Sequence, residues 1–174
     1  MNSLLLIYSI IIYTCKCSLC FKRDKKDKDI KLNSFKIFEE GGGINDKKIN
    51  AVLDLDSTLI YSSLKKIEDI KDYIILNKQL YVYKRPYLNK FLNEISQYCD
   101  LSIYTSATQE YADQIINFID KTKVFNKRYY RTDCIKKNDI HFKDVSKFKY
   151  DEKKLIIVDD YPDCHKGCLG NNNI

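Results

Sequence analysis

The segment Val52-Leu53-Asp54-Leu55-Asp56-Ser57-Thr58 joins an apolar run to a pair of acidic residues. The run begins at Ile49 and predicts a short buried β-strand that extends to Leu55 and ends in acids. Because alternate side chains of an extended backbone point the same way, Asp54 and Asp56 are expected on one side of this strand. Two crowded carboxylates repel each other, so we expect a cation beside them.

Two further buried strands are predicted, and each is also followed by polar residues. Leu101–Tyr104 precedes Thr105-Ser106, and Leu155–Val158 precedes Asp159-Asp160. In open parallel sheets the ligand crevice lies beyond the carboxyl ends of the strands, so the three polar groups are expected to converge. Oxygen ligands of this kind suit a hard ion, and Mg²⁺ fits them better than zinc because it is usually held by one or two carboxylates, phosphate oxygens and water.

This convergence predicts phosphoryl transfer. With its protonation suppressed by the metal and nearby cations, Asp54 could attack phosphorus and form an aspartyl phosphate. Asp56 could then protonate the leaving oxygen and later activate water. Thr105 could donate its hydroxyl to a phosphate oxygen, and a Lys or Arg from the intervening segment could balance the charge that develops during transfer.

The segments between these strands predict helices and a hairpin. Pro86 suits the first turn of a helix with an apolar face at Leu88, Phe91, Leu92 and Ile95. Thr108 can cap a second helix, whose inward face is predicted at Tyr111, Ile115, Phe118 and Ile119. The runs 73–76 and 80–83 flank a polar turn and predict a β-hairpin, and 128–132 is predicted to be extended. The order of elements indicates an α/β, Rossmann-like three-layer sandwich with a central parallel sheet and right-handed crossovers.

Composition excludes several classes of protein. The 174 residues and 20.6 kDa fit one domain, and 44% hydrophobic residues with 5 Gly and 2 Pro exclude a collagenous or wholly disordered chain. The apolar run Leu4–Tyr13 is shorter than the ~20 residues of a spanning helix, which excludes a polytopic membrane protein. Eight basic and three acidic residues lie between Lys16 and Lys36, so the net charge of +6 belongs mainly to an arm, and no direct binding of nucleic acid is expected.

The N-terminal part is predicted to lie outside the folded domain. Residues 1–20 resemble a secretory signal peptide or a short membrane anchor, 21–48 form a basic linker, and 49–174 form the domain. The 7 cysteines lack the spacing of a disulfide framework. Cys164 and His165 lie close to Cys168, but zinc needs four ligands and no second pair is present, so we expect unpaired thiols.

These motifs resemble the haloacid dehalogenase superfamily, specifically its branch of small C-terminal-domain phosphatases, also called NLI-interacting-factor-like phosphatases. The resemblance rests on Val52–Ser63, Tyr83–Pro86, Tyr104–Ala107, Tyr111–Asp113 and Val158–Pro162. It implies the haloacid dehalogenase fold and the activity of an Mg²⁺-dependent phosphoserine/phosphothreonine protein phosphatase, a hydrolase of phosphate monoesters. Several members act on the C-terminal tail of RNA polymerase II.

The resemblance also implies a role for each matching residue. Asp54 is expected to be the nucleophile and a metal ligand, and Asp56 the general acid/base and a metal ligand through its backbone carbonyl. Asp160 is expected to be the last side-chain metal ligand, with Asp159 beside it in the outer shell of the metal. The residues that would bind or neutralise the substrate phosphate are Thr105, Arg131 and Lys143.

The chain departs from the family pattern at two places. Ser57 replaces an acid, and its side chain is expected to point away from the metal. Family domains continue for tens of residues past the last motif, whereas this sequence ends at Ile174. A closing strand and helix are therefore expected to be missing from a domain truncated at its C-terminus, which would leave its activity uncertain.

Two other functions fit part of the pattern. A catalytically inactive phosphatase-like binding protein, such as a mitochondrial inner-membrane translocase subunit, has the same scaffold but commonly lacks the intact acidic pair, which Asp54 and Asp56 preserve here. A signalling receiver domain uses similar residues, but its acceptor Asp follows a later strand than its acidic pair. For localisation, the N-terminal segment favours the secretory pathway or a membrane, and the resemblance favours the nucleus or cytoplasm.

Overall fold

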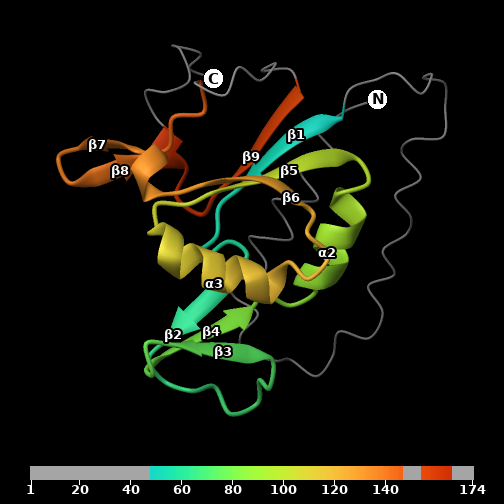
Figure 1. Cartoon of the computed structure of the whole chain (residues 1–174), viewed down its shortest axis with the longest axis vertical. Helices are drawn as coiled ribbons and strands as arrows, with labels where there is room; N and C mark the ends of the chain where they lie inside the picture. Colours follow the sequence, from blue (N-terminus) through green and yellow to red (C-terminus); the bar gives the residue numbers. More distant parts are fainter. Residues whose placement is uncertain (1–47, 147–153, 166–174) are drawn as a thin grey trace. The chain divides into compact units, whose positions relative to one another are not determined.

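The computed structural model describes residues 48–146 and 154–165. Its central sheet has the strand order β6-β5-β1-β9, and all neighbouring strands run parallel, as Figure 1 shows. The strands are β1 (Ile49–Leu53), β5 (Cys99–Tyr104), β6 (Phe125–Tyr129) and β9 (Leu155–Val158). The predicted α/β class with a central parallel sheet is confirmed. The segment predicted to be extended at 128–132 contributes only its first two residues to β6, because a 3₁₀ turn, η1 (Arg131–Asp133), follows.

Helices α2 (Leu88–Ile95) and α3 (Gln109–Ile119) cover one face of this sheet (Figure 1). The chain steps from β1 to β5 to β6 in one direction, and right-handed crossovers of that kind place their helices on the same face. α2 buries Leu88, Leu92 and Ile95 of its predicted apolar face, whereas Phe91, also predicted there, is only half-buried. Its start differs from the prediction, because Tyr87 adopts a left-handed conformation with φ 62° that separates Pro86 from the first helical residue.

The inward face of α3 differs from the predicted one. The buried side chains are Ala112, Ile115, Ile116 and Ile119. Tyr111 and Phe118 were expected inside, but both are only half-buried. The Tyr111 hydroxyl reaches a carboxylate, and the Phe118 ring lies 4.4 Å below the Nζ of Lys84. Thr108 precedes the helix as predicted, although its side chain makes no capping hydrogen bond.

The opposite face of the sheet is covered by the segments that follow β6. Val52, Tyr104 and Val145 form a buried cluster on this face. Tyr129, Cys134, Leu155 and Ile157 pack against that cluster and are partly buried. This packing fixes the segment around Val145 directly over β1 and β5, which places the preceding residues near the carboxyl ends of the strands.

Two smaller sheets are inserted into this arrangement. The predicted hairpin is confirmed as β3 (Tyr73–Leu76) and β4 (Leu80–Lys84), joined by a turn in which Asn77 and Lys78 have positive φ. β2 (Ile60–Ser63) adds to β4 and was not predicted. A further hairpin consists of β7 (Ile135–Lys137) and β8 (Ile140–Phe142), and the last described turn is η4 (Pro162–His165).

The predictions for residues 1–47 and 166–174 lie outside the described residues, and these include the signal-like segment, nearly all of the basic linker and the chain end. Among residues 48–146 and 154–165, no helix is long and apolar enough to cross a membrane.

Candidate active site

The loop after β1 places the first acidic residues at the carboxyl end of the sheet. The backbone N–H of Asp54 donates to the Val158 carbonyl over 2.9 Å, so Asp54 stays beside the end of β9. The chain then closes a tight turn, in which the N–H groups of Leu59 and Ile60 donate to the Leu55 carbonyl at 3.0 and 3.1 Å. Ser57 has φ 61° and is exposed at the outside of this turn.

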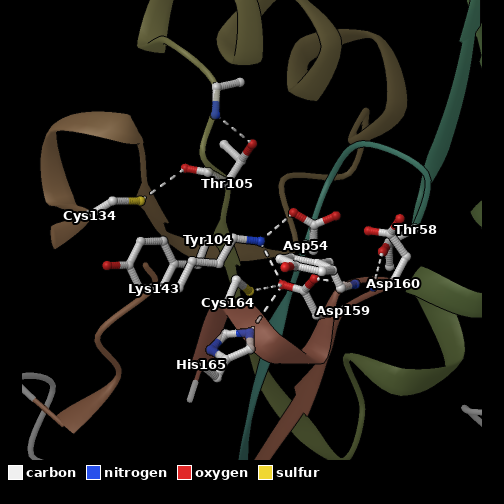
Figure 2. A network of polar contacts seen from close by, with 12 residues as sticks. Asp54, Thr58, Tyr104, Thr105, Cys134, Lys143, Asp159, Asp160, Cys164 and His165 are labelled. Carbon is white, nitrogen blue, oxygen red and sulfur yellow. Dashed lines mark hydrogen bonds and ion pairs between the residues drawn. The ribbon is translucent and has the colours of Figure 1, made fainter. Parts of the chain in front are cut away.

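Lys143 connects two strand ends at the centre of the site. Its Nζ lies 2.5 Å from Oδ1 of Asp54 and 2.6 Å from Oδ2 of Asp159, and Figure 2 shows it between the two carboxylates. The three side chains are almost fully buried, with exposed fractions of 4% for Lys143, 7% for Asp54 and 5% for Asp159. An ammonium group buried between two carboxylates is compensated on both sides, as a buried charge requires.

The electrostatics of the two carboxyl groups differ. Burial, opposed by the Lys143 charge and assisted by the Asp159 charge, raises the pKa of Asp54 to about 7. Burial also acts to raise the pKa of Asp159, but the hydrogen bond from His165 and the Lys143 charge outweigh it and lower the value to about 2. The pKa of Lys143 is raised, because the two carboxylates outweigh the effect of burial. Asp54 is thus the carboxylate whose charge depends most on an additional cation.

A third carboxylate completes a set that fits a divalent cation. One oxygen each from Asp54, Asp159 and Asp160 lies within 4.8 Å of the others. Asp160 is exposed, and its backbone N–H donates to the Oγ1 of buried Thr58 over 3.2 Å, which connects the loop after β9 to the loop after β1. Oxygen donors with one exposed member suit Mg²⁺, which keeps several waters. The predicted ligand set named Asp54, Asp56 and Asp160, whereas the three neighbouring carboxylates include Asp159.

Asp56 makes a different contact. Its Oδ1 accepts a hydrogen bond from the Tyr111 hydroxyl over 2.7 Å. Burial raises the pKa of Asp56, although this hydrogen bond and the Lys143 charge act to lower it. A half-buried carboxyl group with a raised pKa suits an acid that must give and take a proton near neutral pH.

Thr105 and Arg131 lie at the neighbouring strand ends. The N–H of Thr105 donates to the Tyr129 carbonyl at 3.0 Å, and its Oγ1 accepts from the Ala107 N–H at 3.0 Å. Figure 2 shows Thr105 on the side of the site that Asp54 faces. Arg131 is exposed, and its Nε donates to the Ser106 carbonyl at 2.7 Å. Thr105 therefore begins the loop 105–107 and Arg131 holds it from the neighbouring turn, and the carbonyl groups of both residues also accept from Cys134.

Several residues in and around the site were not predicted from the sequence. Tyr111 was assigned to packing, and His165 and Cys164 were considered only as zinc ligands. Arg85, quoted above as part of a family motif, donates from Nη2 to the Ser57 carbonyl at 2.6 Å and so holds the turn after Asp56. Each of these contacts joins residues distant in the sequence or depends on the direction of one side chain. The hydrophobic periodicity of the sequence contains no information about either.

The geometry combines the parts of a phosphoryl-transfer site. A buried carboxylate, Asp54, lies beside a lysine and close to two further carboxylates. A second carboxyl group, Asp56, whose pKa is raised by burial, follows two residues later. Such an arrangement can present a nucleophile, neutralise a phosphate and protonate a leaving group.

Comparison with known proteins finds a matching family and similar phosphatases. A family described as NLI interacting factor-like phosphatase matches residues 49–172. The human carboxy-terminal domain RNA polymerase II polypeptide A small phosphatase 2 is 33% identical over 121 residues, which are 66% of this chain and 44% of that protein. A probable C-terminal domain small phosphatase of Dictyostelium discoideum is 35% identical over 117 residues, which are 64% of this chain and 38% of that protein. The chain spans less than half the length of these relatives.

A solved structure has the same fold. The fission yeast RNA polymerase II CTD phosphatase Fcp1, bound to beryllium fluoride, matches with a TM-score of 0.55 and 23% identity, over 67% of this chain and 38% of that chain. At this identity the likeness shows the fold, and it agrees with the parallel sheet and helices described above.

Proposed function

The chain belongs to the NLI interacting factor-like phosphatase family, a branch of the haloacid dehalogenase superfamily, and from this premise we propose that it is an Mg²⁺-dependent protein serine/threonine phosphatase. The observation that best supports the proposal is the Lys143 bridge. A lysine buried between the carboxylates that end β1 and β9 has a catalytic use, because it can neutralise charge that a phosphate brings into the site. As a purely structural ion pair it would be costly to bury.

In the proposed reaction Asp54 attacks the phosphorus of a phosphoserine or phosphothreonine. A bond forms between phosphorus and a carboxylate oxygen, and the bond from phosphorus to the serine or threonine oxygen breaks. Asp56 gives its proton to that leaving oxygen. In the second step Asp56 accepts a proton from water, whose oxygen attacks the phosphorus, and inorganic phosphate leaves while the Asp54 carboxylate is restored.

The remaining residues bind and neutralise the phosphate. Lys143 would balance the charge that develops as the aspartyl phosphate forms, and the Thr105 hydroxyl and Arg131 would contact phosphate oxygens. Asp54, the Asp56 backbone carbonyl and Asp160 would hold Mg²⁺, with Asp159 beside them, and the ion would supply positive charge for the nucleophile and the phosphate. The neighbouring carboxylate oxygens of Asp54, Asp159 and Asp160 support the two side-chain ligands of this set, Asp54 and Asp160.

We propose a phosphoprotein as the substrate, and the C-terminal tail of RNA polymerase II as the first one to test, since the relatives named above are called phosphatases of that tail. Such a substrate would place the chain in the nucleus or cytoplasm. The alternative, a phosphatase-like binding protein without activity, is less well supported because Asp54, Asp56 and Lys143 are all present and arranged in one site.

The proposal is tested by turnover of para-nitrophenyl phosphate and of a phosphoserine peptide with the polymerase tail repeat. We expect hydrolysis that needs Mg²⁺, stops with a chelator and is abolished in Asp54→Asn. The exposed Asp69 provides a matched control, because Asp69→Asn makes the same chemical change away from the site. A folded protein that binds Mg²⁺ and hydrolyses neither compound would refute the proposal and favour a binding role.

A further inference from the structure

The short turn η4 holds Lys143 at two points. The backbone N–H of Lys143 donates to the Cys164 carbonyl over 3.0 Å. The Nζ of the same residue donates to Oδ2 of Asp159, which the Cys164 and His165 side chains of η4 also contact. The position of the ammonium group beside Asp54 therefore depends on the residues that follow Asp159, and not only on Asp159 itself.

Asp159 is held at both of its carboxylate oxygens. Its Oδ1 accepts the Tyr161 N–H over 2.9 Å. Its Oδ2 accepts from three side chains, namely Lys143 at 2.6 Å, His165 Nε2 at 3.0 Å and the Cys164 thiol at 3.4 Å. Figure 2 shows these side chains gathered around Asp159. Contacts at both oxygens fix the plane of the carboxylate, so Oδ2 keeps one direction toward Lys143.

Within the described residues, the polar contact given for the His165 ring is the hydrogen bond between Nε2 and Oδ2 of Asp159. His165 is buried, with 7% of its surface exposed. An ionised carboxylate can only accept, so the Nε2 atom of His165 must carry the proton of their hydrogen bond. Within residues 48–146 and 154–165 its Nδ1 has no hydrogen-bond partner. Burying an imidazole costs more than burying an apolar side chain of similar size unless its polar atoms are hydrogen-bonded, which indicates that the Nε2 contact has a specific use.

We propose that His165 is a positioning residue for Lys143, acting through Asp159, in the phosphatase reaction proposed above, on which this inference rests. Lys143 has a long flexible side chain, and holding its ammonium against Asp54 needs a partner that does not itself rotate. His165 supplies a rigid donor that keeps Oδ2 of Asp159 in place. Outer partners of this kind commonly determine the geometry of the residues that react.

The same side chains were also considered as a metal site. Asp159, Cys164 and His165 offer one oxygen, one sulfur and one nitrogen within 4.8 Å of one another. However, Oδ2 of Asp159 already accepts from the Lys143 ammonium, so a second cation at that oxygen would lie against a positive charge. The thiol is also held in its protonated form, since burial raises the pKa of Cys164 to about 12. Hydrogen bonding therefore explains the cluster better than metal binding.

The test compares two substitutions at His165 with one at the other histidine. The sequence has only 2 histidines, and His141 lies in β8 outside the contacts described above, so His141→Gln is a matched control. His165→Leu removes the hydrogen-bond donor and puts an apolar side chain in its place. The amide of His165→Gln, in contrast, can still donate to Asp159. Turnover of para-nitrophenyl phosphate with saturating Mg²⁺ gives kcat and KM for each protein, and thermal unfolding checks that each is folded.

We expect His165→Leu to lower kcat by about 10–100-fold, with KM changed by less than about twofold, because the charge-neutralising group is displaced while the substrate-binding residues remain. His165→Gln should recover most of the lost kcat, and His141→Gln should match the wild type. Equal kcat in His165→Leu and the wild type would overturn the inference about His165 and leave the proposed phosphatase function standing. Equal loss in both His165 variants would also overturn the inference, since the ring would then only fill space.

A second measurement does not depend on enzymatic activity, so it tests the inference even if the His165→Leu variant does not fold. Nitrogen-15 NMR of the wild type should show a proton on Nε2 of His165, assigned by its persistence in His141→Gln. A ring that carries its proton only on Nδ1 would overturn the inference, because it could not donate to Asp159. Absence of turnover in the folded wild type would instead refute the proposed function, and the inference with it.

Discussion

The phenolic oxygen of Tyr111 lies 2.7 Å from Oδ1 of Asp56, although 55 positions separate the two residues in the sequence. The contact joins the first turn of α3 to the loop after β1. Burial raises the pKa of the Tyr111 phenol, and so does its hydrogen bond to Asp56, so the phenol stays a donor across the working pH range. Helix α3 thereby fixes the side chain that we propose as the general acid and base.

Removing the Tyr111 hydroxyl should slow the reaction and shift its pH dependence. In Tyr111→Phe the carboxylate form of Asp56 loses a donor, so the pKa of Asp56, already raised by burial, should rise further. We expect kcat to fall by about tenfold, as for the loss of a hydrogen bond to a charged group, and the limb of the kcat profile that Asp56 sets to move to higher pH. Tyr87→Phe, at an exposed ring, is the control. An unchanged profile would contradict the assignment of Asp56.

Much of the fold could be predicted because it depends on local signals. Apolar runs such as Leu155–Val158 indicate buried strands, and a polar turn between two β-rich runs indicates the hairpin 73–83. The errors arise where one side chain has a distant partner. The helical spacing of Tyr111 and Phe118 with Ile115 and Ile119 predicted that both rings face the core, whereas Ala112, which carries little hydrophobic signal, is buried there instead.

For the site, the sequence indicated which strand ends meet but not which atoms touch. Parallel topology alone predicts that Asp54 and Asp159 approach, since both follow neighbouring strands. The family resemblance named Lys143 only as a residue that neutralises the substrate phosphate. Its bridge between the two carboxylates was not predicted, because 16 positions separate Lys143 from Asp159 and the segment between them gives no periodic pattern. The contacts of His165 and Arg85 depend on the path of short turns, so they become visible only in three dimensions.

Asp160 should determine the affinity for Mg²⁺ more than the stability of the protein. Its carboxylate lies close to those of Asp54 and Asp159 and is exposed, so Asp160→Asn removes one negative charge without disturbing the core. We expect the Mg²⁺ concentration for half-maximal activity to rise by about tenfold or more, with kcat at saturating Mg²⁺ changed much less. Asp100→Asn, at an exposed position in β5, should leave the Mg²⁺ dependence unchanged.

Thr58 should matter because it joins two loops of the site. Its buried Oγ1 accepts the Asp160 N–H over 3.2 Å, and Thr58→Val leaves that donor without this partner. We expect Thr58→Val to lower the free energy of unfolding by about 1–2 kcal/mol, measured by urea denaturation, and to weaken Mg²⁺ binding because Asp160 shifts. Thr58→Ser keeps the hydroxyl and should behave like the wild type in Mg²⁺ binding. If the Ser and Val variants lost Mg²⁺ affinity equally, the hydrogen bond would have no role in placing Asp160.

Asp159 should contribute to stability in acid, and the sign follows from its lowered pKa. Burial alone would raise that pKa, but His165 and Lys143 lower it to about 2 from 3.8. The folded protein therefore binds the proton more weakly than the unfolded chain, so the contribution is fully present above about pH 4 and disappears as the pH falls toward 2. The difference between the pKa of Asp159 in the folded protein and its ordinary value corresponds to roughly 2 kcal/mol in the free energy of unfolding.

Asp159→Asn replaces the titrating carboxyl group by an amide, so comparing this variant with the wild type measures the contribution of Asp159 to stability. Urea denaturation of metal-free protein at several pH values should show a stability difference between the wild type and Asp159→Asn that is largest above pH 4. The difference should shrink by roughly 2 kcal/mol as the pH is lowered toward 2, because the wild-type carboxylate is then protonated and holds Lys143 no better than an amide does. Parallel profiles across this range would mean that Lys143 and His165 do not stabilise the charged form of Asp159, and the network around Oδ2 would lose its electrostatic basis.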